Sequence, residues 1–194
     1  MLEVGPDQTT LCSGWNTRDL AAHLAVRDRR ADAMVGALIP PLAGHGEHLR
    51  LSRAARPFAE LVHEVRTPPW WSPVSNRLTD ELANTGEFFI HHEDVRRGRP
   101  DWVPRELEDG EQRALWKMVK LTARFGLRKL GIPVLVRAPG LGEVTVGGDT
   151  PQVTLTGAPG ELALFVSGRQ RAARVDVDGP PEPAERLRTA RLGM

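Results

Sequence analysis

The segment Thr79–Gly98 carries the one residue spacing in this chain that suggests specific chemistry, because Glu87 and His91 lie four residues apart. On a helix this spacing places both side chains on one face, about 40° apart around the axis. Apolar neighbours such as Phe89 and Ile90 predict that this face is enclosed. Burying a carboxylate and an imidazole without a partner is costly. The pattern therefore predicts either a bound cation or a partner charge.

His23 is the candidate for a third ligand, since metal sites in helical bundles draw ligands from more than one helix. It lies in a segment from Thr17 to about Leu38 in which apolar residues recur at helical spacing. His23, Glu87 and His91 would form a set of two histidines and one carboxylate with open coordination positions, which suits Zn²⁺ or another divalent transition metal. The alternative is structural: Glu87 and His91 pair with arginines such as Arg27.

The segment Thr10–Arg30, followed later in the chain by Gly86–Trp102, resembles the DinB-like superfamily in its actinobacterial branch. Within that branch the similarity is to the mycothiol-dependent maleylpyruvate isomerase-like metal-binding proteins. The spacings Trp-x-x-x-Asp-Leu-x-x-His and Glu-x-x-x-His are matched here by Trp15, Asp19, Leu20 and His23, and by Glu87 and His91. The resemblance implies that His23, Glu87 and His91 are the metal ligands.

The same resemblance implies a function and a second site residue. It implies a thiol-dependent isomerase or S-transferase in which one divalent metal ion activates a thiol. Zn²⁺ is the expected ion. Mycothiol is the implied thiol, and a small molecule and a low-molecular-weight thiol are the expected partners. Gly168 and Arg169 match a Gly-Arg pair of the family's C-terminal domain. Arg169 would then be a catalytic residue that binds an anion or a carboxylate of the thiol; by default it is a surface arginine at a helix end.

The expected fold class is α+β: a DinB-like helical bundle over 1–131 and a small α+β domain over 132–194. Helical spacing runs from Glu111 to Leu130, and Gly131 then precedes short runs rich in β-branched residues. Family members have a longer first helix before the Gly-Pro-Asp turn that begins at Gly5. We therefore expect most of the first helix of the bundle to be missing here. Either the true start of the chain lies upstream, or a partner such as a second copy completes the bundle, or one wall of the metal cavity is open.

Between these segments we expect a loop that carries exposed His45 and His48, and then a helix over about Leu51–Arg66. A Pro-rich connection with Trp70 and Trp71 follows. Paired indoles in such a connection are expected to be covered, and they either cap the core or form the rim of a pocket.

Composition narrows the class of function. The chain of 194 residues has 26 lysines and arginines against 25 acidic residues, and this balance argues against nucleic-acid binding. Its single cysteine, Cys12, rules out an intramolecular disulfide and is expected to be a half-buried structural thiol. No apolar run has the length of a membrane span, and no signal-peptide pattern opens the chain, so a cytoplasmic location is expected. A non-catalytic metal- or ligand-binding module remains the alternative function.

Overall fold

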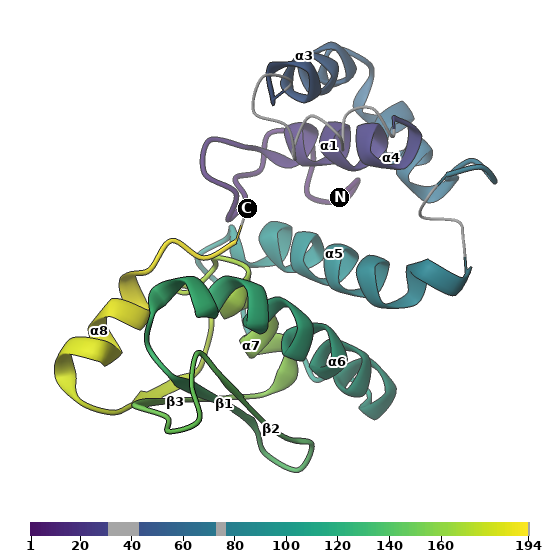
Figure 1. Cartoon of the computed structure of the whole chain (residues 1–194). Helices are drawn as coiled ribbons and strands as arrows, with labels where there is room; N and C mark the ends of the chain where they lie inside the picture. The colour runs from purple at the N-terminus through teal and green to yellow at the C-terminus, as the bar shows by residue number, and fades with distance from the viewer. Residues whose placement is uncertain (31–42, 73–76, 194) are drawn as a thin grey trace. The chain divides into compact units, whose positions relative to one another are not determined.

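The computed structural model describes residues 1–30, 43–72 and 77–193, and the side chains of residue 43 and residues 77–83 lie outside that description. The helices and strands of the described residues are labelled in Figure 1 and run in this order: α1 (Thr17–Arg29), α3 (Ala43–Ala54), α4 (Phe58–Arg66), α5 (Arg77–Arg97), α6 (Asp109–Gly126), η3 (Leu127–Leu130), β1 (Val134–Ala138), β2 (Gly142–Val146), β3 (Val153–Thr156), α7 (Pro159–Val166), β4 (Asp176–Asp178) and α8 (Pro181–Thr189).

The chain divides into two compact units, to both of which α5 contributes. One unit comprises Met1–Asn84 and His91–Val103, and the other comprises Thr85–Ile90 and Pro104–Met194. The mixed α+β class expected from the sequence is confirmed: the N-terminal part is helical, and the strands in the described part of the chain all follow η3. The predicted domain boundary at 131/132 falls between the last helical residue, Leu130, and the first strand. The compact unit that contains the sheet also includes α6, which precedes that boundary.

In the first unit, α1 begins at a capping box, in which the Asn16 side chain accepts from the backbone N–H of Asp19 and the Asp19 side chain accepts in return. This arrangement satisfies two amide groups at the helix start. One face of α1, including Ala21 and Ala22, packs against Leu61 of α4. The predicted uninterrupted helix from Thr17 to about Leu38 is wrong, because α1 ends at Arg29 and Arg30 is its C-cap with non-helical backbone angles. Residues 31–38 lie outside the described residues.

The predicted helix over Leu51–Arg66 is two helices, because Pro57 lies between α3 and α4. Proline cannot donate a helical hydrogen bond, and its ring clashes with the preceding turn. The predicted loop with His45 and His48 was wrong, since both lie in α3, although both are exposed as expected. The interruption by Gly44 and Gly46 suggested a loop, and tertiary packing overrides that preference.

Trp70 and Trp71 are not covered among the described residues: their exposed fractions are 89% and 52%. The expectation that something buries these indoles is wrong for the part of the chain that the structure describes. The start of α5 at Arg77 is two residues before the predicted helix start at Thr79.

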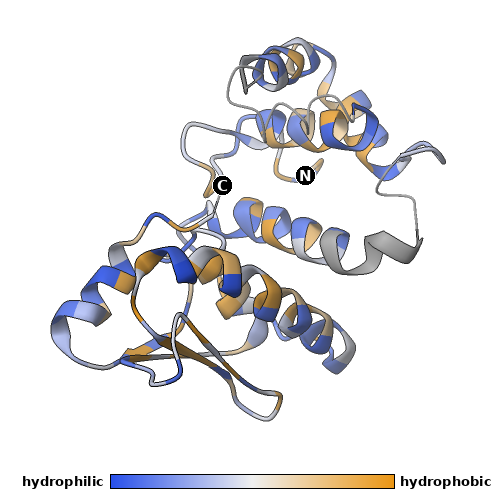
Figure 2. Cartoon of the chain, in the orientation of Figure 1, coloured by the Kyte–Doolittle hydropathy of each residue, from blue (hydrophilic) through white to orange (hydrophobic). Residues whose placement is uncertain are grey.

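The second unit is built on a four-stranded sheet in the order β2-β1-β3-β4. β1 pairs parallel with β3, and the other neighbouring strands are antiparallel. Figure 1 shows α6 and α7 over the sheet, and Figure 2 shows hydrophobic and hydrophilic residues alternating along α6. α6 buries Leu115 and Val119 one turn apart. Among the described residues, no helix is both long enough and apolar enough to cross a bilayer.

Candidate metal centre

His91 is the centre of a polar cluster on the C-terminal half of α5. Its exposed fraction is 8%, and that of Asp94, one turn further along the helix, is 0%. The two side chains meet because residues three apart on a helix share a face. His91 Nδ1 lies 2.8 Å from Asp94 Oδ2.

The structure brings His23, Glu87 and His91 together. One ligand atom from each residue lies within 4.8 Å of the ligand atoms of the other two. His23 reaches this point from α1, where its ring centroid is 5.3 Å from that of His91 at an interplanar angle of 71°. Glu87 and His91 lie on consecutive turns of α5, as the sequence spacing predicted. The convergence is as predicted; metal binding by these residues stays a prediction.

The chemistry of this donor set fits a divalent metal ion. Zn–N and Zn–O bonds of about 2.0–2.2 Å place neighbouring ligand atoms of a tetrahedral site about 3.3–3.6 Å apart. The ligand atoms of this group lie within 4.8 Å of one another, so binding of such an ion would bring them closer together. His23 and Glu87 are half-buried, whereas His91 is buried.

Asp94 determines which nitrogen of His91 can bind a metal. A carboxylate oxygen accepts hydrogen bonds, so the contact of 2.8 Å assigns the ring hydrogen to Nδ1. Nε2 is then the ring nitrogen that carries no hydrogen, and only this nitrogen has the lone pair that a metal ion would need. Asp94 therefore has the position of the carboxylate that orients a metal-binding histidine in many metal sites. The spacing of His91 and Asp94 in the sequence is compatible with this contact, since residues three apart on a helix share a face.

Trp15 packs against the ring of His23, and Arg50 in turn packs against Trp15. The Trp15 and His23 ring centroids are 5.2 Å apart, and the Arg50 guanidinium lies 4.8 Å from the Trp15 ring centroid. Asp19 and Glu47 both accept from Arg50. Hydrogen bonding to Glu47, and then to Asp19, raises the pKa of Arg50 against the opposing effect of burial. The Trp15 and Asp19 positions of the sequence motif thus serve to position the histidine.

A second donor group, which sequence reasoning did not propose, consists of Cys12, His91 and Asp94. Cys12 Sγ lies 3.1 Å from Asp94 Oδ2. The cysteine is half-buried, as expected. The sequence contained one signal for this group, the spacing of His91 and Asp94. It contained none for Cys12, which is 82 residues away from Asp94 along the chain.

Glu93 forms a separate buried ion pair on the other side of the same helix turn. Its Oε2 accepts from Arg97 Nε at 2.7 Å and its Oε1 from Arg96 Nη1 at 2.8 Å. Arg97 also lies over the Trp102 ring, 4.3 Å from the centroid. Burial raises the pKa of Glu93, but hydrogen bonds from Arg97 and Arg96 outweigh it, so the pKa lies below the ordinary value of 4.5.

Arg169 lies just after α7, beyond Gly168, whose φ of 87° ends the helix in a left-handed turn. Its guanidinium donates to the backbone carbonyl of Ser167 at 2.6 Å. This is the helix-end position that the sequence gave as the default for Arg169. Its catalytic role stays a prediction.

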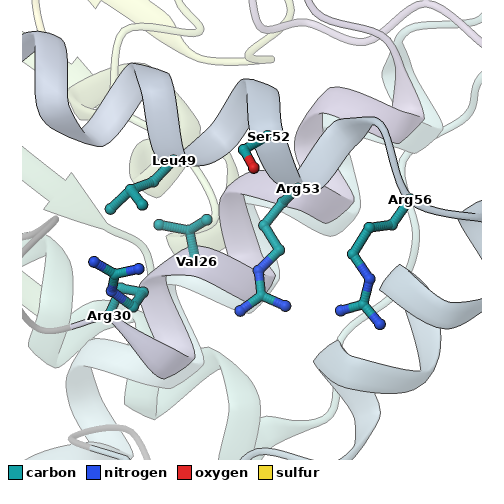
Figure 3. Close-up of a pocket in the computed structure, with 6 residues that line it drawn as sticks. All are labelled: Val26, Arg30, Leu49, Ser52, Arg53 and Arg56. Atoms are coloured by element: carbon teal, nitrogen blue, oxygen red, sulfur yellow. The ribbon is translucent and has the colours of Figure 1, made fainter.

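Figure 3 shows a pocket of about 300 Å³ in the first unit. It is lined by Val26, Arg30, Leu49, Ser52, Arg53 and Arg56. Arg53 and Arg56 both bind Glu64, which offsets much of their charge. None of the proposed metal ligands lines this pocket, so we do not assign it to the candidate centre.

Comparison with known proteins does not add an identity: no family model, curated protein or solved structure matches the chain. Membership of the DinB-like superfamily therefore stays a prediction from the two ligand segments.

Proposed function

We propose that this chain is a divalent-metal-binding protein whose mononuclear site is formed by His23, Glu87 and His91. The observation that carries the proposal is the convergence of these ligand atoms within 4.8 Å. Two further features support it. His91 is buried and held by Asp94, and His23 is packed between Trp15 and His91. Such packing reduces the rotamer entropy that metal binding would otherwise have to overcome.

We further propose that the site serves a thiol-dependent isomerase or S-transferase. A divalent ion held there would lower the pKa of a coordinated thiol or water, so that a nucleophile exists near neutral pH. Three protein ligands leave coordination positions open, as in catalytic rather than structural zinc sites. The chain's own residues orient the ligands: Asp94 holds the His91 hydrogen at Nδ1, and Trp15 packs on His23.

The resemblance of the ligand segments supports the finer parts of this proposal. These are a DinB-like bundle, mycothiol as the thiol, Zn²⁺ as the metal ion and Arg169 as the residue that binds an anionic group of substrate or thiol. A cytoplasmic location, a small electrophilic substrate and a homodimer belong to the same proposal. The three proposed ligands His23, Glu87 and His91, together with Arg169, are the positions at which mutation tests it.

Isothermal titration of the metal-stripped protein with Zn²⁺ tests the site. We expect one ion per chain. His23→Ala and Glu87→Gln should each weaken Zn²⁺ binding by about 100-fold, because each removes a direct ligand. Mutation of a residue that only hydrogen-bonds to a ligand typically weakens binding by about 10–100-fold. His92→Ala is the matched control, because His92 is exposed and adjoins His91 on α5. Zn²⁺ binding that is unchanged in both ligand variants would remove the proposal.

A second experiment separates the enzyme from a non-catalytic metal-binding module. Metal-loaded protein is incubated with a low-molecular-weight thiol and a panel of electrophiles, and thiol adducts or isomerised products are measured by mass spectrometry and chromatography. The enzyme predicts product formation that is lost in Glu87→Gln and retained in His92→Ala. Metal binding without any product would favour the non-catalytic module. Elemental analysis of the purified protein tests the structural alternative, which predicts no bound metal.

A further inference from the structure

We infer that Cys12, His91 and Asp94 form a second metal site, specific for thiophilic divalent cations, that competes with the first site for His91. The three ligand atoms lie within 4.8 Å of one another. Sulfur, nitrogen and oxygen donors in one group favour softer cations, such as Cd²⁺ and Zn²⁺, over Mg²⁺ or Mn²⁺.

The hydrogen-bond geometry already approximates a coordination geometry. Asp94 Oδ2 accepts from Cys12 Sγ at 3.1 Å and from His91 Nδ1 at 2.8 Å. Tetrahedral zinc with Zn–S of about 2.3 Å and Zn–N of about 2.0 Å requires ligand separations of about 3.3–3.6 Å. The two sets of distances differ by about 0.2–0.8 Å. A cation can therefore replace the hydrogens that now link the three atoms, with only small side-chain shifts.

The loop that carries Cys12 is fixed to α5, so the thiol is held in place. Leu11 N–H donates to the carbonyl of Asp94 at 3.0 Å, and the Thr9 hydroxyl donates to the carbonyl of Gly98 at 2.9 Å. A Cβ at residue 98 would collide with the Thr9 backbone, so this close approach depends on glycine. These contacts preorganise the sulfur beside His91 and Asp94, which lowers the entropic cost of binding.

Proton balance makes the two sites exclusive. A cation at the second site takes the Cys12 sulfur as a thiolate, and the thiol proton leaves to solvent. It also takes His91 Nδ1, so the ring hydrogen moves from Nδ1 to Nε2. A neutral imidazole has only one nitrogen without hydrogen. His91 then cannot offer Nε2 to the first site, and the protein holds one ion per chain, at one site or the other. This competition rests on the proposed function; the existence of the second site does not.

Titration of metal-stripped, reduced protein with Cd²⁺ tests the inference, because thiolate coordination produces a sulfur-to-cadmium charge-transfer band in the near ultraviolet. Cys12 is the single cysteine, so any such band reports this residue. We expect a band that saturates at one Cd²⁺ per chain and disappears in Cys12→Ser, with Cd²⁺ binding weakened at least about 10-fold. Glu87→Gln is the matched control and should retain the band, since it removes a ligand of the first site only.

Alkylation provides a second readout that does not depend on a folding-sensitive variant. Cd²⁺ should protect Cys12 of the wild type from iodoacetamide, and Mg²⁺ should not. Absence of the band together with unprotected Cys12 would overturn the second site. Two Cd²⁺ ions per chain, or a band that is unchanged after preloading with Zn²⁺, would overturn the competition.

The two proposals can fail separately. If Zn²⁺ binding depends on His23 and Glu87 but no cadmium band forms, the second site fails and the proposed function stands. If the cadmium band forms while Zn²⁺ binding is unaffected by His23→Ala and Glu87→Gln, the proposed function fails and the second site stands.

Discussion

Two polar clusters with buried carboxylates share one turn of α5, and their carboxylates, those of Glu93 and Asp94, have different kinds of partner. Glu93 is bound by the guanidiniums of Arg96 and Arg97. Asp94 accepts from an imidazole and a thiol, those of His91 and Cys12. A guanidinium does not give up its hydrogens, whereas an imidazole and a thiol can exchange theirs for a metal ion. The same helix thus carries one cluster suited to stability and one suited to metal binding.

The largest effect expected from this contrast is on stability. Glu93→Ala leaves Arg97, whose side chain is 2% exposed, without this carboxylate partner, and breaking a buried pair from one side costs about 3–5 kcal/mol. Denaturation with urea measures the loss. Glu185→Ala, which removes the exposed partner of Arg188, is the control and should cause no measurable loss. Equal free energies of unfolding for Glu93→Ala and the wild type would contradict a stabilising role of the Glu93 cluster.

An intermediate effect is expected on metal affinity. Asp94→Asn should weaken Zn²⁺ binding by about 10–100-fold, because the amide no longer fixes the His91 hydrogen at Nδ1. Calorimetric titration measures the change. The comparison predicts that Glu93→Gln, at the neighbouring residue, leaves Zn²⁺ affinity within about threefold of the wild type, since Glu93 is not among the candidate ligands. Equal losses in the two variants would mean that the clusters are not separate.

The smallest effect is a pH dependence of stability that arises from Glu93. Its pKa in the folded protein is lowered, so the folded state favours the charged form more than the unfolded state does. The stabilisation is complete above the ordinary value of 4.5 and is lost as the pH falls through the lowered folded-state pKa. The difference in unfolding free energy between wild type and Glu93→Gln should shrink below pH 4.5, as followed by urea denaturation at a series of pH values. A difference that grows with acidification would contradict the sign.

Local sequence patterns predicted those parts of the fold that depend on local interactions. The spacing of Glu87 and His91, the start of α1 at Thr17 and the β-branched runs after Gly131 all depend on neighbours within a few residues. The division at Pro57 was within reach as well, since proline alone accounts for it. The helical state of His45 and His48 was not, because it depends on packing of α3 against α1 and α4.

The candidate site was predictable in part for the same reason. His23, Glu87 and His91 could be proposed from two helical patterns, and Asp94 follows from its position one turn after His91. The role of Cys12 could not be predicted, because it depends on hydrogen bonds between a loop and a helix far apart in the sequence. Trp70 and Trp71 are exposed, although indole rings are usually well buried. That general tendency does not say which particular tryptophan of a chain is buried.

The attachment of the Cys12 loop to α5 also sets an order of events during folding. The contact between Thr9 and Gly98 spans 89 residues, so it cannot form on the ribosome until α5 has been synthesised. Contacts of such long range close late, after the loop-closure entropy has been overcome. The sulfur therefore reaches its final surroundings only when the first and last parts of this unit meet, and its loss of accessibility marks that step in time.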